Sequence, residues 1–114
     1  MGDEKDLLAG LVLELRRGTL VLSVLSQMAE EKYGYALVQS LEKKDVEIDP
    51  NTLYPLLRRL EKQGLLESRW DTGGSKPRKY YRRTAVGTEI YLELKKQWRQ
   101  MAGGMDALME EDEG

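Results

Sequence analysis

A stretch near the middle of the chain, DPNTLYPLLRRLEKQG (residues 49–64), carries signals for both ends of one helix. Asp49 is a favoured N-cap residue, Pro50 suits the first helical position, and Gly64 readily adopts the left-handed conformation that ends a helix. The leucines between them recur at helical spacing and form one apolar stripe, made of Leu53, Leu56, Leu57 and Leu60. These features predict a helix over residues 50–63 with one buried face.

One residue inside this helix works against it. Pro55 has no N–H to donate to the carbonyl of Asn51, and its ring crowds the preceding turn, at a cost of up to about 3 kcal/mol. Asn51, Thr52 and Tyr54 project from the same end of the helix, away from the apolar stripe. We interpret this end as shaped to contact another molecule, with leucine packing holding the rest. The alternative is that Asn51 and Thr52 only complete the cap.

Three segments before this helix also show helical spacing of their apolar residues: KDLLAGLVLELRR, TLVLSVLSQM and YGYALVQSLEKK. Gly18 is the predicted break between the first two. Short helices joined by tight connections are typical of a helix-turn-helix domain. In such domains the N-terminal residues of the second motif helix enter the major groove of DNA, where amide and hydroxyl side chains suit base edges or phosphates.

After Gly64 the pattern changes to the alternation typical of strands. The segments LLESRW and KYYRRT are separated by DTGGSKPR, a loop rich in glycine and proline. They predict a two-stranded hairpin with a basic tip, in which Trp70 is expected to be a core residue. The predicted fold class is therefore mainly α with a small β-hairpin.

A last long helix is predicted from its N-cap, Thr84, to Glu111. Its apolar residues follow spacings of three and four, close to a heptad seam, and are Ile90, Leu94, Trp98, Met101, Met105 and Leu108. A single seam on a terminal helix needs a partner to cover it. Gly103 and Gly104 each cost about 1 kcal/mol relative to alanine, so we expect a kink or a close backbone approach there.

The composition excludes several classes of site. The chain has 114 residues, enough for one small domain, and contains neither cysteine nor histidine, which excludes thiolate nucleophiles, imidazole bases, Cys/His zinc sites and disulfides. It also has no phosphate loop and no nucleophile beside a base. We therefore expect a protein that is not an enzyme and has no cofactor or metal. The absence of a long apolar run or a signal-peptide pattern predicts a cytoplasmic protein that does not enter a membrane.

The charges are unevenly distributed. The net charge is −2, but the segment from Arg58 to Arg83 has nine basic and three acidic residues, a net +6, which leaves −8 for the rest. Lys76, Arg78 and Lys79 lie at the predicted hairpin tip, beside the helix of residues 50–63. Such a tip can grip phosphates or a minor groove. The alternative is an ordinary solvated basic surface.

Three aromatic residues are further candidates. Tyr33 and Tyr35 flank Gly34 at the start of a predicted helix, where hydroxyls and helix-end N–H groups can meet a phosphate, although half-buried packing is the commoner role. Trp98 lies in the middle of the terminal seam. It can stack on its symmetry mate or on a flat ligand, or serve only as a core or interface residue.

The segments YGYALVQSL, DPNTLYPLLRRLEKQGLLESRW and KPRKYYRRTAVG, followed by a tryptophan-bearing last helix, closely resemble the PadR family of bacterial transcriptional regulators. The similarity covers residues 15–102. The resemblance implies a winged helix-turn-helix with a C-terminal dimerisation helix. It also implies a homodimer that binds a palindromic site in double-stranded DNA, usually as a repressor.

Carried onto this chain, the resemblance makes residues 50–63 the recognition helix and residues 73–79 the wing. The implied DNA-binding residues are Tyr33, Tyr35, Asn51, Thr52, Tyr54, Arg58, Lys76, Arg78 and Lys79. The implied division is an N-terminal helical extension (residues 1–14), a DNA-binding domain (residues 15–84) and a dimerisation helix (residues 85–111). Arg83 departs from the family pattern, which often has an apolar residue there, so the packing beneath the second strand is open.

Two other functions stay open. Some PadR-like proteins bind planar aromatic compounds between paired tryptophans of the last helix, so the resemblance implies a possible ligand site at Trp98, Leu94 and Met101. The leucines of residues 1–14 are expected to cross the dimer or to cover this space. The other rival is a dimeric protein-interaction module whose basic wing meets an acidic protein.

Overall fold

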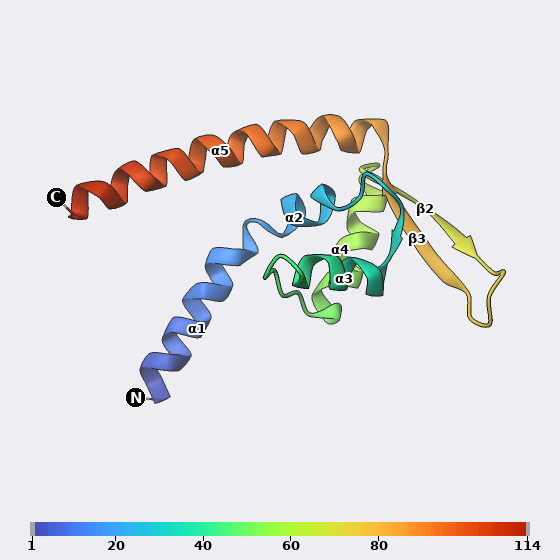
Figure 1. Cartoon of the computed structure of the whole chain (residues 1–114), viewed down its shortest axis with the longest axis horizontal. Coiled ribbons are helices and arrows are strands. Elements are labelled where there is room, and N and C mark those ends of the chain that lie inside the picture. Colours follow the sequence, from blue (N-terminus) through green and yellow to red (C-terminus); the bar gives the residue numbers. More distant parts are fainter. Residues whose placement is uncertain (1, 114) are drawn as a thin grey trace.

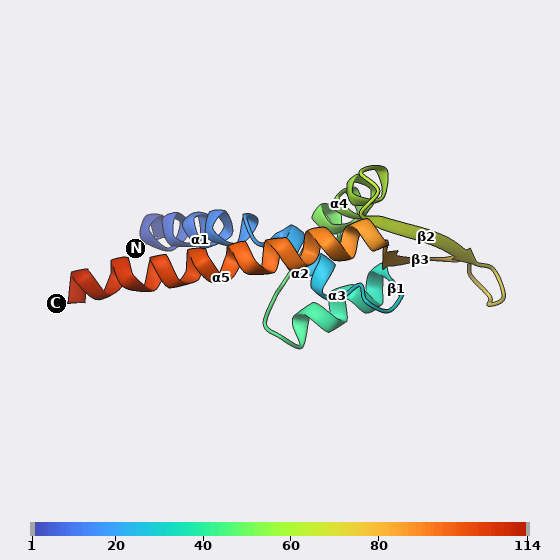
Figure 2. The ribbon, with the colours of Figure 1, turned by 90° about the horizontal axis from the view of Figure 1, so that it is seen from above.

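The computed structural model describes residues 2–113. The elements follow in the order α1 (Gly2–Arg17), α2 (Leu20–Ser26), β1 (Lys32–Tyr33), α3 (Gly34–Glu42), α4 (Pro50–Lys62), β2 (Leu66–Asp71), β3 (Arg78–Arg83) and α5 (Ala85–Glu113). Figures 1 and 2 show a small central domain from which the β2–β3 hairpin projects at one end, while α1 and α5 extend toward the other. The molecule is therefore elongated, with extents of 59 × 37 × 23 Å.

The sheet has three antiparallel strands in the order β1-β3-β2, one more than the predicted hairpin. β2 and β3 pair from Leu66 opposite Arg83 to Asp71 opposite Arg78. β1 adds two pairs on the other side of β3. The predicted two-stranded hairpin is confirmed as β2 and β3. The additional strand β1 was not predicted, because a two-residue strand is too short to show an alternating pattern.

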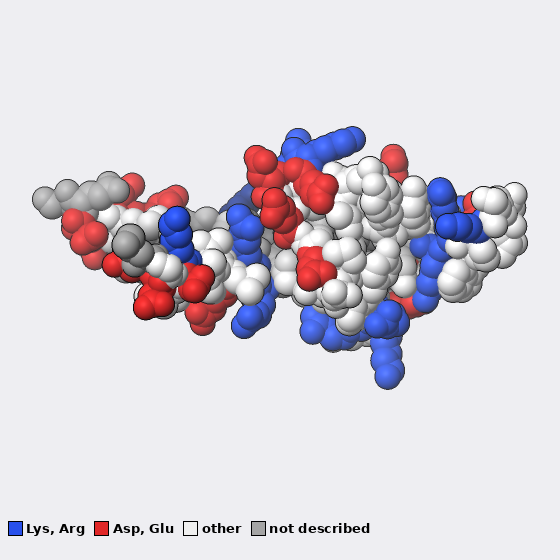
Figure 3. Space-filling model, turned by 90° about the horizontal axis from the view of Figure 1, so that it is seen from below, with Lys and Arg blue, Asp and Glu red and all other residues white. Residues whose placement is uncertain are grey.

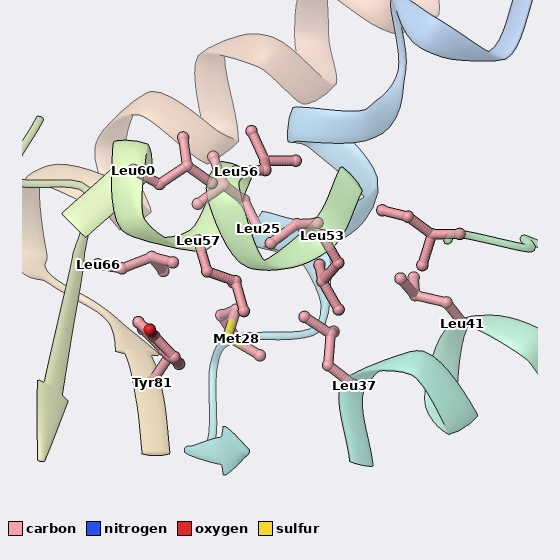
Figure 4. Close-up of a cluster of buried hydrophobic side chains, with 12 residues drawn as sticks. Leu25, Met28, Leu37, Leu41, Leu53, Leu56, Leu57, Leu60, Leu66 and Tyr81 are labelled. Carbon is pink, nitrogen blue, oxygen red and sulfur yellow. The ribbon is translucent and has the colours of Figure 1, made fainter. Parts of the chain in front are cut away.

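The core lies between α2, α3, α4 and one face of the sheet (Figure 4). All four leucines of the predicted stripe on α4 are buried there. The other core members come from α2, α3, β2, β3 and two loops and are Val24, Leu25, Met28, Leu37, Leu41, Ile48, Leu66 and Tyr81. α4 is thus fixed by its inner face, and its outer face stays exposed.

Both ends of α4 are as predicted. The Asn51 N–H donates to Asp49 Oδ1 at 2.8 Å, which makes Asp49 the N-cap, and Gly64 has a φ of +81° just after the helix. The helix continues through Pro55 to Lys62. The lost hydrogen bond at Pro55 is therefore tolerated, because the leucine stripe on both sides of it is packed into the core.

The predicted break at Gly18 separates α1 from α2. Residues 2–14 of the N-terminal extension are helical, and α1 contains no buried residue. Its leucines are all more than half exposed: Leu7, Leu8, Leu11, Leu13 and Leu15. α1 and α5 leave the core on the same side and diverge (Figure 1), so the apolar surfaces of both helices are largely exposed.

α5 begins where the sequence predicts. Thr84 Oγ1 accepts a hydrogen bond from the Gly87 N–H at 2.9 Å and donates one to the Gly64 carbonyl at 2.6 Å, which ties the helix to the end of α4. The helix is continuous through Gly103 and Gly104, and a Cβ at either position would meet nothing within 4 Å. Figures 1 and 2 show α5 gently curved with no sharp kink, so the expected kink or close approach is not found within residues 2–113. Helix-favouring residues on both sides outweigh the poor helix propensity of glycine.

Trp70 is not a core residue, contrary to the prediction, since its side chain is 62% exposed. The hairpin projects past the helices that cover its base (Figure 1), and Trp70 lies near its outer end, opposite Lys79. Core residues of the sheet are instead Leu66 and Tyr81, at the base. The alternating pattern predicted the strand correctly, but it does not show how far along the hairpin the covering helices reach.

Arg83 packs at the junction of the sheet and α5. Its Nη1 donates to the Leu25 carbonyl at 2.9 Å, and its guanidinium lies 4.5 Å from the ring centre of Tyr91. The long side chain thus replaces an apolar residue by hydrogen bonding to a helix end and covering an aromatic ring.

Across residues 2–113, no helix combines the length and apolar content needed to cross a membrane.

Candidate nucleic-acid interface

The front of α4 is exposed and is positioned by its contact with α3. Asn51, Thr52 and Tyr54 are all solvent-exposed, and the Tyr54 side chain is 41% exposed. Its ring lies directly against the backbone of Gly34, where a Cβ would come within 2.4 Å of the ring. Gly34 therefore permits the close approach that holds Tyr54 at the surface between the two helices.

Tyr33 and Tyr35 have different environments. The Tyr33 ring packs edge-on against Tyr80, with ring centres 5.5 Å apart, and the Arg78 guanidinium lies 4.6 Å from the Tyr33 ring centre. Tyr35, on the first turn of α3, is 60% exposed. Tyr33 is thus a packing residue that carries a cation on its face, and Tyr35 projects into solvent.

The three predicted wing cations are not equivalent. Lys76 lies in the exposed loop between β2 and β3, whereas Arg78 and Lys79 belong to β3. Lys79 is only 28% exposed and forms an ion pair with Glu61 of α4, with 3.1 Å between Nζ and Oε1. The structure therefore places Lys79 at the junction of the β2–β3 hairpin and α4, and of the three cations only Lys76 lies at the predicted hairpin tip.

Glu61 was missed by the sequence analysis, and it joins α4 to both long strands. Its carboxylate accepts a hydrogen bond from the Ser68 hydroxyl on β2 and contacts Lys79 on β3. The hydrogen bond from Ser68, and after it the pairing with Lys79, hold the pKa of Glu61 below its ordinary value of 4.5. The hydrogen bond to Glu61 raises the pKa of Lys79. The only sequence signal was an acidic residue within a basic segment.

A cleft of about 440 Å³ lies between the front of α4, the start of α3 and the wing. Its lining includes Tyr54 and Arg58 from α4 and Trp70 and Pro77 from the β2–β3 hairpin. No carboxylate lines it among the described residues, and within residues 2–113 Arg58 has no ion-pair partner. Of the predicted site residues, Tyr33, Tyr54, Arg58, Arg78 and Lys79 therefore share one concave basic surface, with Trp70 as an added aromatic wall. Tyr35, Asn51, Thr52 and Lys76 do not line it.

The opposite face of the hairpin carries ion pairs instead. Arg69 donates to both carboxylate oxygens of Glu31, and this hydrogen bonding holds the pKa of Glu31 below its ordinary value. Arg82 contacts Glu67 at 2.7 Å, with both side chains more than half exposed. In Figure 3, Lys and Arg lie around the wing and along the neighbouring part of the central domain, while Asp and Glu gather near the two chain ends and in a second cluster over the middle of the molecule. The charges of the two signs are therefore concentrated in different places but are not fully separated.

A second hollow, of about 650 Å³, separates α5 from the start of α2 and the end of α1. Trp98, Leu94 and Met101 all line it, together with Leu15 and Met105. Trp98 is 44% exposed. The three residues predicted for a ligand or dimer surface therefore lie together.

Within residues 2–113, no group of three His, Cys, Asp or Glu side chains is arranged to hold a metal ion.

Comparison with known proteins decides the family. A model described as the "Transcriptional regulator PadR-like family" matches residues 21–100, which run from α2 into α5. The chain belongs to this family. It is therefore a PadR-family transcriptional regulator, which confirms the resemblance found in the sequence.

Individual PadR relatives agree with this result. A crystal structure of a PadR family regulator from Eggerthella lenta is 54% identical, covers 96% of this chain and 97% of its own, and has a TM-score of 0.90. A PadR-like regulator from Bacillus cereus is 31% identical over 84% of this chain and 96% of its own, with a TM-score of 0.74. A transcriptional regulator of Mycobacterium tuberculosis is 35% identical over 96 residues, 80% of this chain and 90% of its own. The fold is the PadR winged helix.

Proposed function

We propose that this PadR-family regulator acts as a homodimer that binds a palindromic promoter site in double-stranded DNA and represses transcription. The observation that carries the proposal is the shared concave surface formed by the front of α4 and the basic wing. The segment from Arg58 to Arg83 carries a net +6 in a chain of net −2. Phosphates attract this basic segment and repel the acidic remainder of the chain, which would orient the molecule on a duplex.

The roles divide along this surface. α4 enters the major groove with its N-terminal end, where Asn51 and Thr52 meet base edges. Tyr54, Arg58 and the two tyrosines of the α3 start, Tyr33 and Tyr35, contact the backbone. The wing meets phosphate or the minor groove through Lys76, Arg78 and Lys79.

Dimerisation is proposed to use α5. Its exposed apolar residues continue along one seam, with Trp98 44%, Met101 65%, Met105 52% and Leu108 61% exposed. A surface of this kind needs a partner, and a second copy related by a two-fold axis supplies an identical seam. The half-sites would then lie about one helical turn, roughly 10 base pairs, apart. We keep residues 1–14 as an extension, residues 15–84 as the DNA-binding domain and residues 85–111 as the dimerisation helix.

The test is an anisotropy titration of the protein against the duplex immediately upstream of its own gene, at two salt concentrations, with random duplex as competitor. Tight, salt-sensitive and competitor-resistant binding is expected, because counterion release scales with the phosphates met. Absence of binding at low salt would contradict the proposal and favour the protein-interaction module. Sedimentation at the same concentrations would give the oligomeric state.

A ligand-responsive form of this function is favoured by one observation. The hollow beside Trp98 is large and lined mainly by apolar side chains. A planar aromatic compound would stack on the indole there. Titration of a Trp70→Phe variant with proflavine tests this, since Trp98 is then the remaining tryptophan. Saturable quenching at micromolar dye would support a ligand site, and a linear response would contradict it.

A further inference from the structure

We propose that the cleft between α4 and the wing seats the sugar-phosphate backbone of one DNA strand, with the indole of Trp70 packed against a deoxyribose. This inference rests on the proposed DNA binding and adds a contact residue and its chemistry. Trp70 lies on β2, opposite Lys79, and its side chain is 62% exposed although it is among the largest apolar groups in the chain. Because the indole is large and largely apolar, its burial against a binding partner would favour association.

The position of the cleft selects the backbone as the occupant. A recognition helix reads the major groove and a wing reaches the adjacent minor groove. One phosphodiester strand separates the two grooves of a duplex. The concave surface between α4 and the β2–β3 hairpin, of about 440 Å³, lies where that strand must pass.

The lining matches this occupant in charge and in polarity. Arg58, Arg78 and Lys79 contribute cations, and no carboxylate among the described residues lines the cleft. Glu61, the nearby acid, is occupied by Ser68 and Lys79. Trp70 and Pro77 form an apolar wall on the wing side. Cations suit the phosphate oxygens, and the apolar wall suits the C–H groups of the sugar.

The two tryptophans allow a direct test. In a Trp98→Phe variant, Trp70 is the remaining fluorophore, and its emission is expected to change when calf-thymus duplex DNA is added to saturation. In the matched Trp70→Phe variant, the emission of Trp98 is expected to stay unchanged. Trp70→Ala is expected to weaken binding to the upstream duplex and to random duplex alike, by about tenfold. Its salt slope should equal that of the wild type, because the contact is not ionic.

Two results would overturn the inference and leave DNA binding intact. One is binding by Trp70→Ala within twofold of the wild type, with no emission change at Trp70. The other is a loss confined to the upstream duplex, which would make Trp70 a base-reading residue. Failure of the wild type to bind any duplex would instead overturn the proposed function itself. Trp70→Phe provides a second affinity variant if Trp70→Ala has a lowered melting temperature.

Discussion

The ammonium of Lys79 lies 3.1 Å from the carboxylate of Glu61, so strand β3 of the wing is joined to the last turns of α4. The hydroxyl of Ser68 donates to the same carboxylate from β2. One acidic side chain therefore joins both long strands to α4. Lys79, which the sequence predicts as a phosphate contact, is therefore also engaged in an ion pair within the protein.

Replacing Glu61 with glutamine is expected to lower stability at neutral pH by about 1 kcal/mol or less, the range of partly exposed ion pairs. The pKa of Glu61 is lowered in the folded state, so its contribution is present above its ordinary value of 4.5 and disappears as the pH falls through the folded pKa. Urea unfolding at pH 7 and at a series of lower pH values, at one protein concentration, measures this. The difference between the two proteins should be largest at pH 7 and should shrink as the pH falls below 4.5.

The matched control is Glu67→Gln on the same sheet. Glu67 pairs with Arg82, and the two side chains are 51% and 58% exposed. Such exposed pairs contribute little, so this variant should stay within about 0.5 kcal/mol of the wild type. An equal loss in both variants would contradict the special role of Glu61.

A second prediction concerns Gly34 and Tyr54. A Cβ on residue 34 would lie 2.4 Å from Tyr54 Cε1, so Gly34→Ala must push the ring outward. The ring is a mobile side-chain end and 41% exposed, so the cost in stability should be below about 1 kcal/mol, whereas DNA affinity should fall several-fold. Anisotropy titrations measure the affinity, and thermal unfolding measures the stability.

A double-mutant cycle separates this mechanism from a general defect. If Gly34→Ala acts by displacing Tyr54, its effect on DNA affinity should vanish in a Tyr54→Ala background. Additive losses would mean that Gly34 acts in another way. Tyr54→Phe provides a milder variant that keeps the ring and removes the hydroxyl.

Much of the fold was predictable because its signals are local. The caps of α4 depend on Asp49, Pro50 and Gly64, which act within one turn of the helix end. The same holds for Thr84 at the start of α5. The leucine stripe was predictable because a period of 3.6 is visible in any amphipathic helix.

Apart from the expected kink at Gly103 and Gly104, the errors concern relationships between distant segments. The strand Lys32–Tyr33 is defined only by its pairing with Tyr80 and Tyr81. The exposure of Trp70 depends on where the covering helices end, and the role of Glu61 depends on side chains that arrive from two strands. Periodicity in one segment carries no information about such pairings.

Gly87 provides a third prediction, at the junction of α5 with the end of α4. A Cβ there would lie 1.9 Å from the carbonyl oxygen of Leu65, which also accepts the Thr84 N–H at 3.1 Å. Because the obstacle is backbone, Gly87→Ala should lower stability by about 2–3 kcal/mol. Gly103→Ala is the control, since a methyl group there meets nothing within 4 Å. It should leave stability unchanged or raise it by up to about 1 kcal/mol. Equal melting temperatures for both variants would contradict the predicted clash.

The last prediction separates base reading from phosphate contact. Asn51 is exposed at the front of α4, and Lys76 lies in the exposed loop of the wing. Asn51→Ala should reduce the preference for the operator over random duplex, with each lost base contact worth about 1–3 kcal/mol. Lys76→Gln should weaken binding to both duplexes equally and reduce the slope of log affinity against log salt by about one. Titrations of each variant at several salt concentrations measure both quantities. The same uniform loss from both substitutions would contradict this division, because removal of a base contact should change which sequence is preferred.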